Sequence, residues 1–143
     1  HINPWLGFFK QLMQTMYLLK KTKPRVNVTE VLHGGMFILQ YLLERNEAVL
    51  PSEISGEMEI STARIAAALN NLEKKRLINR AINKNDRRQI LVTLTAEGKE
   101  LAKKNQQEIE NHIASMLQSL GEHDAVEFVR ILNRIVGLQV NRE

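Results

Sequence analysis

The sequence predicts a mainly α-helical protein with one small β-hairpin. Three observations support this prediction. Apolar residues recur at helical spacing near both ends of the chain, two short helical patterns meet at a tight turn between Pro51 and Arg76, and apolar and polar residues alternate from Arg88 to Leu94. Together they predict a helix-turn-helix followed by a hairpin, with further helices on both sides.

Length and composition indicate a single folded domain without thiol chemistry. The 143 residues are 43% hydrophobic, which is enough for a core, and no apolar run is long enough to cross a bilayer. We expect no signal peptide, and His1 is given no role because the chain does not begin with methionine. The absence of cysteine excludes disulfides, thiolate metal sites and thiol-based sensing, and it favours a cytoplasmic protein.

The first helix is expected from about Asn3 to Lys23. Pro4 suits a first helical turn, and Pro24 ends the helix. Large apolar side chains surround much of it, so it must pack against later elements or a second subunit. A second helix is expected to begin between Thr29 and His33 and to end at Arg45. Its side chains Met36, Phe37, Leu39, Tyr41, Leu42 and Leu43 are assigned mostly to the core.

The central stretch contains the helix-turn-helix and the hairpin. After a possible short strand at residues 48–50, a helix is expected at Pro51–Met58, with a turn at Glu59–Ile60. Ser61 is a candidate N-cap for the next helix, which should run from Thr62 to about Arg76. Its expected buried stripe is Ile65, Ala68, Leu69 and Leu72. The hairpin strands are expected at 77–83 and 88–94, with Ile90, Val92 and Leu94 on the buried side and a basic turn between them.

Two helices complete the chain. Thr95 is expected to cap a long helix that ends near Ser119, Gly121 breaks it, and a last helix follows at about 122–139. We therefore predict one winged domain over residues 1–143. Residues about 30–95 form a lobe, and residues about 1–24 and 96–143 supply helices for dimerisation.

Positive charge is concentrated in the lobe. Residues 61–95 hold eight basic and two acidic side chains, a net charge of +6, whereas the whole chain carries +4. The remainder is thus slightly acidic. A local positive field of this kind is expected of a phosphate-binding face, although a solvated charged face would give the same composition.

A helix-turn-helix followed directly by a basic hairpin is more specific than either motif alone. The major groove of DNA admits one α-helix, and a hairpin beside that helix can reach the neighbouring minor groove, where arginine is favoured. The pattern therefore predicts a winged helix-turn-helix that binds double-stranded DNA.

At these residues the chain resembles the MarR family of bacterial regulators. Residues 61–75 are similar to the family's recognition helix, which opens on serine and closes on Leu-Glu-Lys-Lys. Asp86-Arg87-Arg88, Val92, Leu94-Thr95 and Gly98 are similar to its wing signature, Asp-x-Arg followed by an apolar strand and Leu-Thr-x-x-Gly. The resemblance implies a homodimer that binds a palindromic operator, usually as a repressor released by a small, often phenolic, ligand.

The resemblance also implies roles for particular residues. Arg88 would enter the minor groove, and Asp86 would orient the wing. Two departures are present: Arg76 stands where the family usually has glycine, and Ala66 and Ala67 stand where polar or basic residues are common. The residues assigned to DNA are Ser61, Thr62, Arg64, Ala67, Asn70, Asn71, Lys74, Lys84, Asp86, Arg87 and Arg88.

An effector pocket is a weaker prediction. Its candidates are Met13, Tyr17, Met36, Phe37 and Tyr41, although such side chains more often belong to a core or a dimer interface. The four histidines have no metal-ligand spacing, so no metal and no cofactor are predicted.

Two other functions were weighed against DNA binding. A winged helix used only for protein–protein interaction would expose apolar side chains on its recognition helix, which Arg64, Lys74 and the wing charges oppose. An enzyme is not indicated, because no nucleophile–base pair, paired carboxylates or phosphate-binding glycine loop is present.

Overall fold

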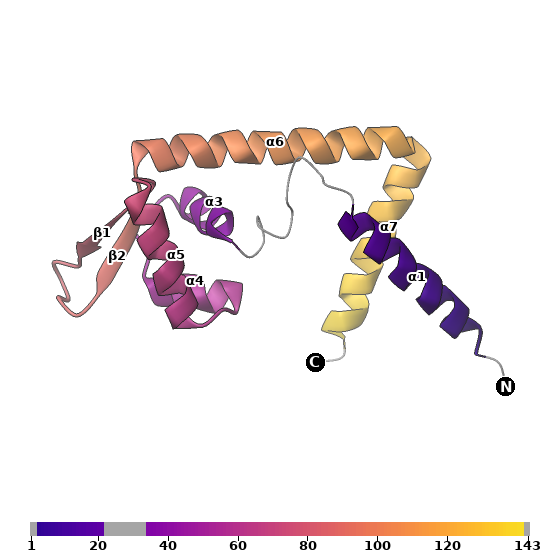
Figure 1. The fold of residues 1–143 in the computed structure, drawn as a ribbon, viewed down its shortest axis with the longest axis horizontal. Helices are drawn as coiled ribbons and strands as arrows, with labels where there is room; N and C mark the ends of the chain where they lie inside the picture. Colours follow the sequence, from indigo (N-terminus) through magenta and orange to yellow (C-terminus); the bar gives the residue numbers. More distant parts are fainter. Residues whose placement is uncertain (1–2, 22–33, 142–143) are drawn as a thin grey trace.

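The computed structural model describes residues 3–21 and 34–141. Figure 1 shows a lobe at one end, a long helix α6 that leads away from it, and helices α1 and α7 at the other end. The elements are α1 Pro4–Lys21, α3 Gly35–Arg45, α4 Pro51–Met58, α5 Thr62–Lys74, β1 Ile78–Ile82, β2 Ile90–Leu94, α6 Ala96–Leu120 and α7 Glu122–Val140. The predicted connector at 25–29, Lys23, Pro24 and both predicted starts of the second helix, Thr29 and His33, lie outside the described residues.

The hydrophobic core lies entirely within the lobe and its junction with α6. Helices α3, α4 and α5 each contribute apolar side chains from one face, and the hairpin and α6 close the cluster. The buried members are Ile38, Leu39, Leu42, Val49, Ile54, Met58, Ile65, Leu69, Leu72, Ile78, Val92 and Ala102. Met36, Phe37, Tyr41 and Leu43, which the sequence assigned to the core, are only partly buried around it.

The helix-turn-helix follows the prediction closely. Helix α4 ends at Met58 and is capped by Glu59, which takes the left-handed conformation that turns the chain. Helix α5 then begins after Ser61, whose hydroxyl accepts a hydrogen bond from the backbone N–H of Arg64. This is the N-cap expected from the sequence, because a serine oxygen satisfies an N–H that lacks a helical partner.

Helix α5 ends two residues before the predicted Arg76. Lys75 is its C-cap, and Arg76 has a φ of 61°. This left-handed conformation explains why glycine is usual at this position in the MarR family, which the chain resembles, because glycine adopts it without steric cost. In this chain Arg76 takes the same conformation.

The wing consists of β1, β2 and the connecting residues 83–89. The strands are antiparallel, with Ile78 opposite Leu94 and Ile82 opposite Ile90. The predicted short strand at 48–50 is reduced to one bridge, in which Val49 pairs with Val92. This bridge brings the rest of the lobe against the hairpin at Val92, and the lobe covers only that end of the hairpin. Val92 is therefore buried, whereas the prediction that Ile90 lies on the buried side is wrong: Ile90 is exposed.

The start of α6 joins the wing to the long helix. Thr95 caps α6 by accepting from the N–H of Gly98 and donates its hydroxyl to the carbonyl of Arg76 at 2.7 Å. Gln40 on α3 donates to the carbonyl of Ala102, 2.6 Å away, which holds the lobe against α6. The predicted cap and the break at Gly121 are both present.

Helices α1 and α7 bury almost none of their apolar side chains within this chain. In α7 no residue is buried, and the large apolar side chains of α1 are exposed, as Trp5 is at 72%. None of the helices in the described part of the chain is long and apolar enough to span a membrane.

Candidate nucleic-acid interface

The exposed face of α5 is the first part of the candidate interface. Ile65, Leu69 and Leu72 anchor the opposite face in the core. Helical spacing therefore places the remaining side chains on an outward strip, as expected for a helix that enters a groove. The exposed residues of this strip are Ser61, Thr62, Ala63, Arg64, Ala66, Ala67, Asn70, Asn71, Glu73 and Lys74.

Three of the exposed side chains near the N-terminal end of this strip are small. Ala63, Ala66 and Ala67 carry only a methyl group each and are exposed. Small side chains let a helix backbone approach a partner closely, and a methyl group can contact a thymine methyl but cannot hydrogen-bond a base edge. Polar contacts from this strip must therefore come from Ser61, Thr62 and Arg64, or from residues near its C-terminal end.

Asn70 is already engaged within the protein. Its amide oxygen accepts a 2.7 Å hydrogen bond from Nη2 of Arg80 on β1. A bidentate contact with adenine uses both the oxygen and the nitrogen of an asparagine amide. In this conformation one of the two groups needed for that contact is already engaged by Arg80.

The wing turn is held by short-range hydrogen bonds. Asn83 accepts from the N–H of Asn85 at 3.0 Å and donates its amide to Gln89, also at 3.0 Å. The N–H of Gln89 donates to the carbonyl of Asp86. Sequence reasoning missed Asn83 and Gln89, although an asparagine at the start of a turn is a recognised sign of such a bond.

Asp86 and Arg88 form the most specific pair on the wing. One carboxylate oxygen of Asp86 accepts from both the backbone N–H of Arg88, at 3.1 Å, and its Nε, at 3.2 Å. The side chain of Arg88 is 91% exposed, whereas that of Asp86 is 34% exposed. The carboxylate thus orients an arginine that projects into solvent.

The other basic residues predicted to meet DNA are also accessible. Lys84 and Arg87 are exposed, and with Ile82 and Asn83 they line a shallow hollow on the wing. Lys74 is exposed near the end of α5. The arrangement places cations on both the helix and the wing, where they can approach phosphates on either side of a groove.

The predicted effector-pocket residues do not come together within one chain. Met13 and Tyr17 lie on the exposed α1. Phe37 and Tyr41 stack on each other on α3, with ring centroids 6.4 Å apart. Met36 contacts Asn105 of α6 instead.

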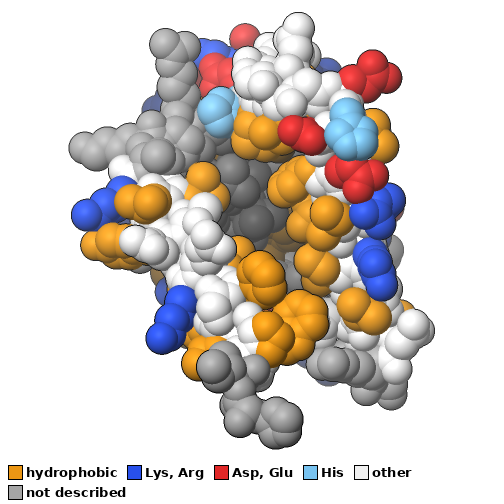
Figure 2. Space-filling view, turned by 90° about the vertical axis from the view of Figure 1, so that its right-hand side faces the viewer, with side chains coloured by type: hydrophobic (Ala, Val, Ile, Leu, Met, Phe, Trp, Pro, Cys, Tyr) orange, Lys and Arg blue, Asp and Glu red, His pale blue; other side chains and the backbone are white. Residues whose placement is uncertain are grey.

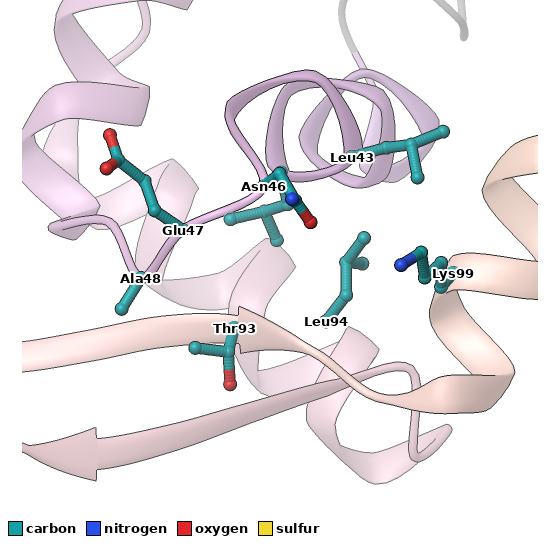
Figure 3. Close-up of a pocket in the computed structure, with 8 residues that line it drawn as sticks. Leu43, Asn46, Glu47, Ala48, Thr93, Leu94 and Lys99 are labelled. Carbon is teal, nitrogen blue, oxygen red and sulfur yellow. The ribbon is translucent and has the colours of Figure 1, made fainter.

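A different pocket, which the sequence did not indicate, lies between α3, β2 and α6. Its volume is about 220 Å³, and its lining includes Leu42 and Leu43 of α3. Figure 3 shows Asn46, Leu94 and Lys99 pointing toward a common space while Glu47 points away. The pocket combines an apolar floor with a polar, exposed rim.

The described residues contain no cluster of three His, Asp or Glu side chains suited to a metal.

A family model described as a winged helix DNA-binding domain matches residues 36–113. In sequence, the chain is 28% identical over 120 residues to YwhA of Bacillus subtilis, an uncharacterized HTH-type transcriptional regulator. That match covers 82% of this chain and 86% of YwhA.

Solved structures share the fold over most of the chain. YusO of Bacillus subtilis has a TM-score of 0.73 at 24% identity, with coverage of 96% of this chain and 99% of YusO. FabT of Streptococcus pneumoniae, solved in complex with DNA, has a TM-score of 0.67 at 15% identity and covers 96% of each chain. MepR of Staphylococcus aureus, a transcription regulator of the multidrug efflux pump MepA, has a TM-score of 0.64 at 19% identity. That match covers 73% of this chain and 77% of MepR.

Proposed function

Because the chain belongs to the winged helix DNA-binding domain family and is an HTH-type DNA-binding transcriptional regulator, we propose that it acts in the cytoplasm as a homodimeric repressor. It binds a palindromic operator and leaves it when a small molecule binds. The observation that carries this proposal is the pairing of an exposed α5 strip with a wing whose Arg88 is oriented by Asp86.

Each subunit places α5 in a major groove and the wing at the adjacent minor groove. Ser61, Thr62 and Arg64 meet bases or phosphates at the start of α5, while Lys74, Lys84 and Arg87 contact phosphates. Arg88 enters the minor groove, where the negative potential of narrow A·T-rich stretches favours a guanidinium. Affinity then comes mainly from phosphates, and sequence preference from few side chains.

Dimerisation covers the apolar surfaces of α1 and α7. Figure 2 shows hydrophobic side chains gathered on both sides of a hollow at this end of the molecule. So much exposed apolar surface is unfavourable in water and marks an interaction site. The large exposed side chains are Trp5, Leu6, Phe8, Phe9, Leu12, Met13, Met16, Tyr17, Leu18 and Leu19 on α1, and Val126, Phe128, Val129, Ile131, Leu132, Ile135, Val136, Leu138 and Val140 on α7.

Two-fold symmetry sets the form of the operator. Two α5 helices in successive major grooves require half-sites about one helical turn apart, near 10 bp between centres. An effector, small and often phenolic among MarR-type regulators, acts by changing the distance between the two lobes. A dimer held at the wrong spacing loses both grooves together.

The test is selection of binding sites from random duplex DNA, followed by affinity measurements on the selected duplex. We expect a palindromic site and a Kd that rises steeply with salt, because bound phosphates release counterions. Enrichment of no site and a flat salt response would show that the wing serves protein–protein interaction instead. Repeating the measurement with candidate phenolic compounds tests release.

A further inference from the structure

Arg80, on β1, makes a bridge between the two DNA-contacting elements. Its Nε donates to Oε2 of Glu73 at 3.1 Å, and its Nη2 donates to Oε1 of the same carboxylate at 3.1 Å. The same Nη2 also reaches the amide oxygen of Asn70 at 2.7 Å. We call these three side chains the Arg80 bridge.

The Arg80 bridge connects one side of α5 to the end of the hairpin that the core holds in place. Asn70 and Glu73 are three residues apart in α5, so they lie on one side of the helix. Arg80 stands opposite Val92 in the hairpin, and Val92 is fully buried and pairs with Val49. The guanidinium therefore ties the C-terminal part of α5 to the anchored end of the wing.

The chemistry of the bridge favours one geometry. A guanidinium and a carboxylate that share two parallel hydrogen bonds fix each other's plane, which an ammonium group cannot do. The pair holds the pKa of Glu73 below its ordinary range through the hydrogen bonds from Arg80. The Arg80 side chain is 27% exposed and that of Glu73 is 43% exposed, so solvent reduces the contribution of the pair to folding stability.

We propose that Arg80 is a positioning residue that sets the angle between α5 and the wing, so that one subunit can occupy its major and minor grooves at once. Arg80 contributes to binding through Glu73 and Asn70, and not by contacting a phosphate itself. This inference rests on the proposed function. It also assigns Asn70 to the bridge, whereas the sequence predicted it among the residues that contact DNA.

Glu73→Gln gives the sharpest test, because the two explanations predict opposite signs. Removal of a negative charge from a DNA-facing surface should strengthen binding if charge alone matters. If the bridge sets the angle, the same substitution weakens binding on the order of tenfold, because α5 and the wing then no longer fit their grooves together. Glu57→Gln, at an exposed position of α4, is the matched control and should leave affinity unchanged or slightly higher.

Arg80→Lys separates positioning from charge. It retains the positive charge but not the paired hydrogen bonds, so we expect it to bind as weakly as Glu73→Gln. Footprinting of both variants should show reduced minor-groove protection at the wing while guanine N7 protection by α5 persists. Thermal unfolding of both variants should remain close to that of the wild type, since the pair is partly solvated.

Three results would overturn the inference: undiminished binding by Glu73→Gln, wild-type affinity in Arg80→Lys, or an even loss of protection in both grooves. If the wild-type chain binds no duplex, the proposed function fails, and residual dipolar couplings of the free protein still decide the bridge. In the wild type, α5 and wing amides should fit one alignment tensor. In Glu73→Gln they should not, and a common tensor there would refute the role of Arg80.

Discussion

Gly98 of α6 lies directly against the backbone carbonyl of Leu77. A Cβ placed on Gly98 would stand 1.9 Å from that oxygen and 2.9 Å from its carbon. The same carbonyl accepts the N–H of Thr95 at 3.1 Å. The glycine of the Leu-Thr-x-x-Gly signature is thus required by the contact between the turn after α5 and the first turn of α6.

We expect Gly98→Ala to lower the free energy of unfolding by at least about 2 kcal/mol, because backbone must move to admit the methyl group. Chemical denaturation of the two proteins measures the difference. Gly56→Ala is the control, since a Cβ there has no neighbour within 4 Å. That helical substitution should stabilise the protein by about 0.5–1 kcal/mol, and equal effects of the two would contradict the proposed contact.

Arg76→Gly should raise stability by about 1 kcal/mol, because arginine pays a steric cost at a φ of 61° that glycine does not. Thermal unfolding gives the comparison. At the neighbouring Lys75, with a φ of −79°, glycine brings no such relief and should destabilise. A lower stability of Arg76→Gly would mean that the arginine side chain makes a compensating contact.

Arg88→Ala should weaken operator binding on the order of tenfold at fixed salt while leaving fold and dimer intact. The side chain is 91% exposed and pairs with Asp86, so its loss should change folding stability by less than about 0.5 kcal/mol. Titration of labelled operator by fluorescence anisotropy measures the affinity. Arg45→Ala removes an equal charge from the end of α3 and should bind normally; a similar loss in both variants would reduce the wing's role to net charge.

Ile135→Asp should convert the proposed dimer to single chains of 16.4 kDa, measured by light scattering. A carboxylate on α7 would have to be buried in the proposed interface, where burial of an unpaired charge is strongly unfavourable. Ile82→Asp places the same charge on an exposed isoleucine of the wing. That variant should remain dimeric, and a wild-type mass for Ile135→Asp would place the interface elsewhere.

The Arg80 bridge should weaken in acid. The hydrogen bonds from Arg80 lower the pKa of Glu73, so its contribution to folding is present at neutral pH and is lost as pH falls through that lowered pKa. An NMR titration of side-chain carboxyl carbons should show a Glu73 midpoint below the ordinary value of a glutamate. In Arg80→Lys that midpoint should rise; a Glu73 midpoint at the ordinary value in the wild type would contradict the paired geometry.

Much of the fold could be predicted because local signals agree with one another. Ser61, Thr95 and Gly121 mark helix boundaries through hydrogen bonding and backbone conformation, which depend on a few neighbouring residues. The hairpin and its Asp86–Arg88 pair were likewise local. The winged helix predicted from these signals is confirmed by the match to the winged helix DNA-binding domain family, and MepR and FabT share the fold.

The remaining features depend on contacts between distant segments. Ile90 follows the alternation of a half-buried strand, but the lobe covers only the end of the hairpin near Val92. Asn70 belongs to a bridge that only the packing of β1 against α5 creates. The pocket beside Lys99 similarly needs α3, β2 and α6 to meet. Periodicity along the chain contains none of this information.

Helix α6 also acts as a lever between the lobe and α7. Its 25 residues span about 37 Å at the rise of an α-helix, and it meets α7 at Gly121, whose φ of 86° makes a sharp corner. A rotation of about 5° at that corner would displace the lobe by about 3 Å, close to one base-pair step of DNA. In the proposed dimer, small changes in packing at the far end would thus be magnified into a mismatch of one base pair for each subunit.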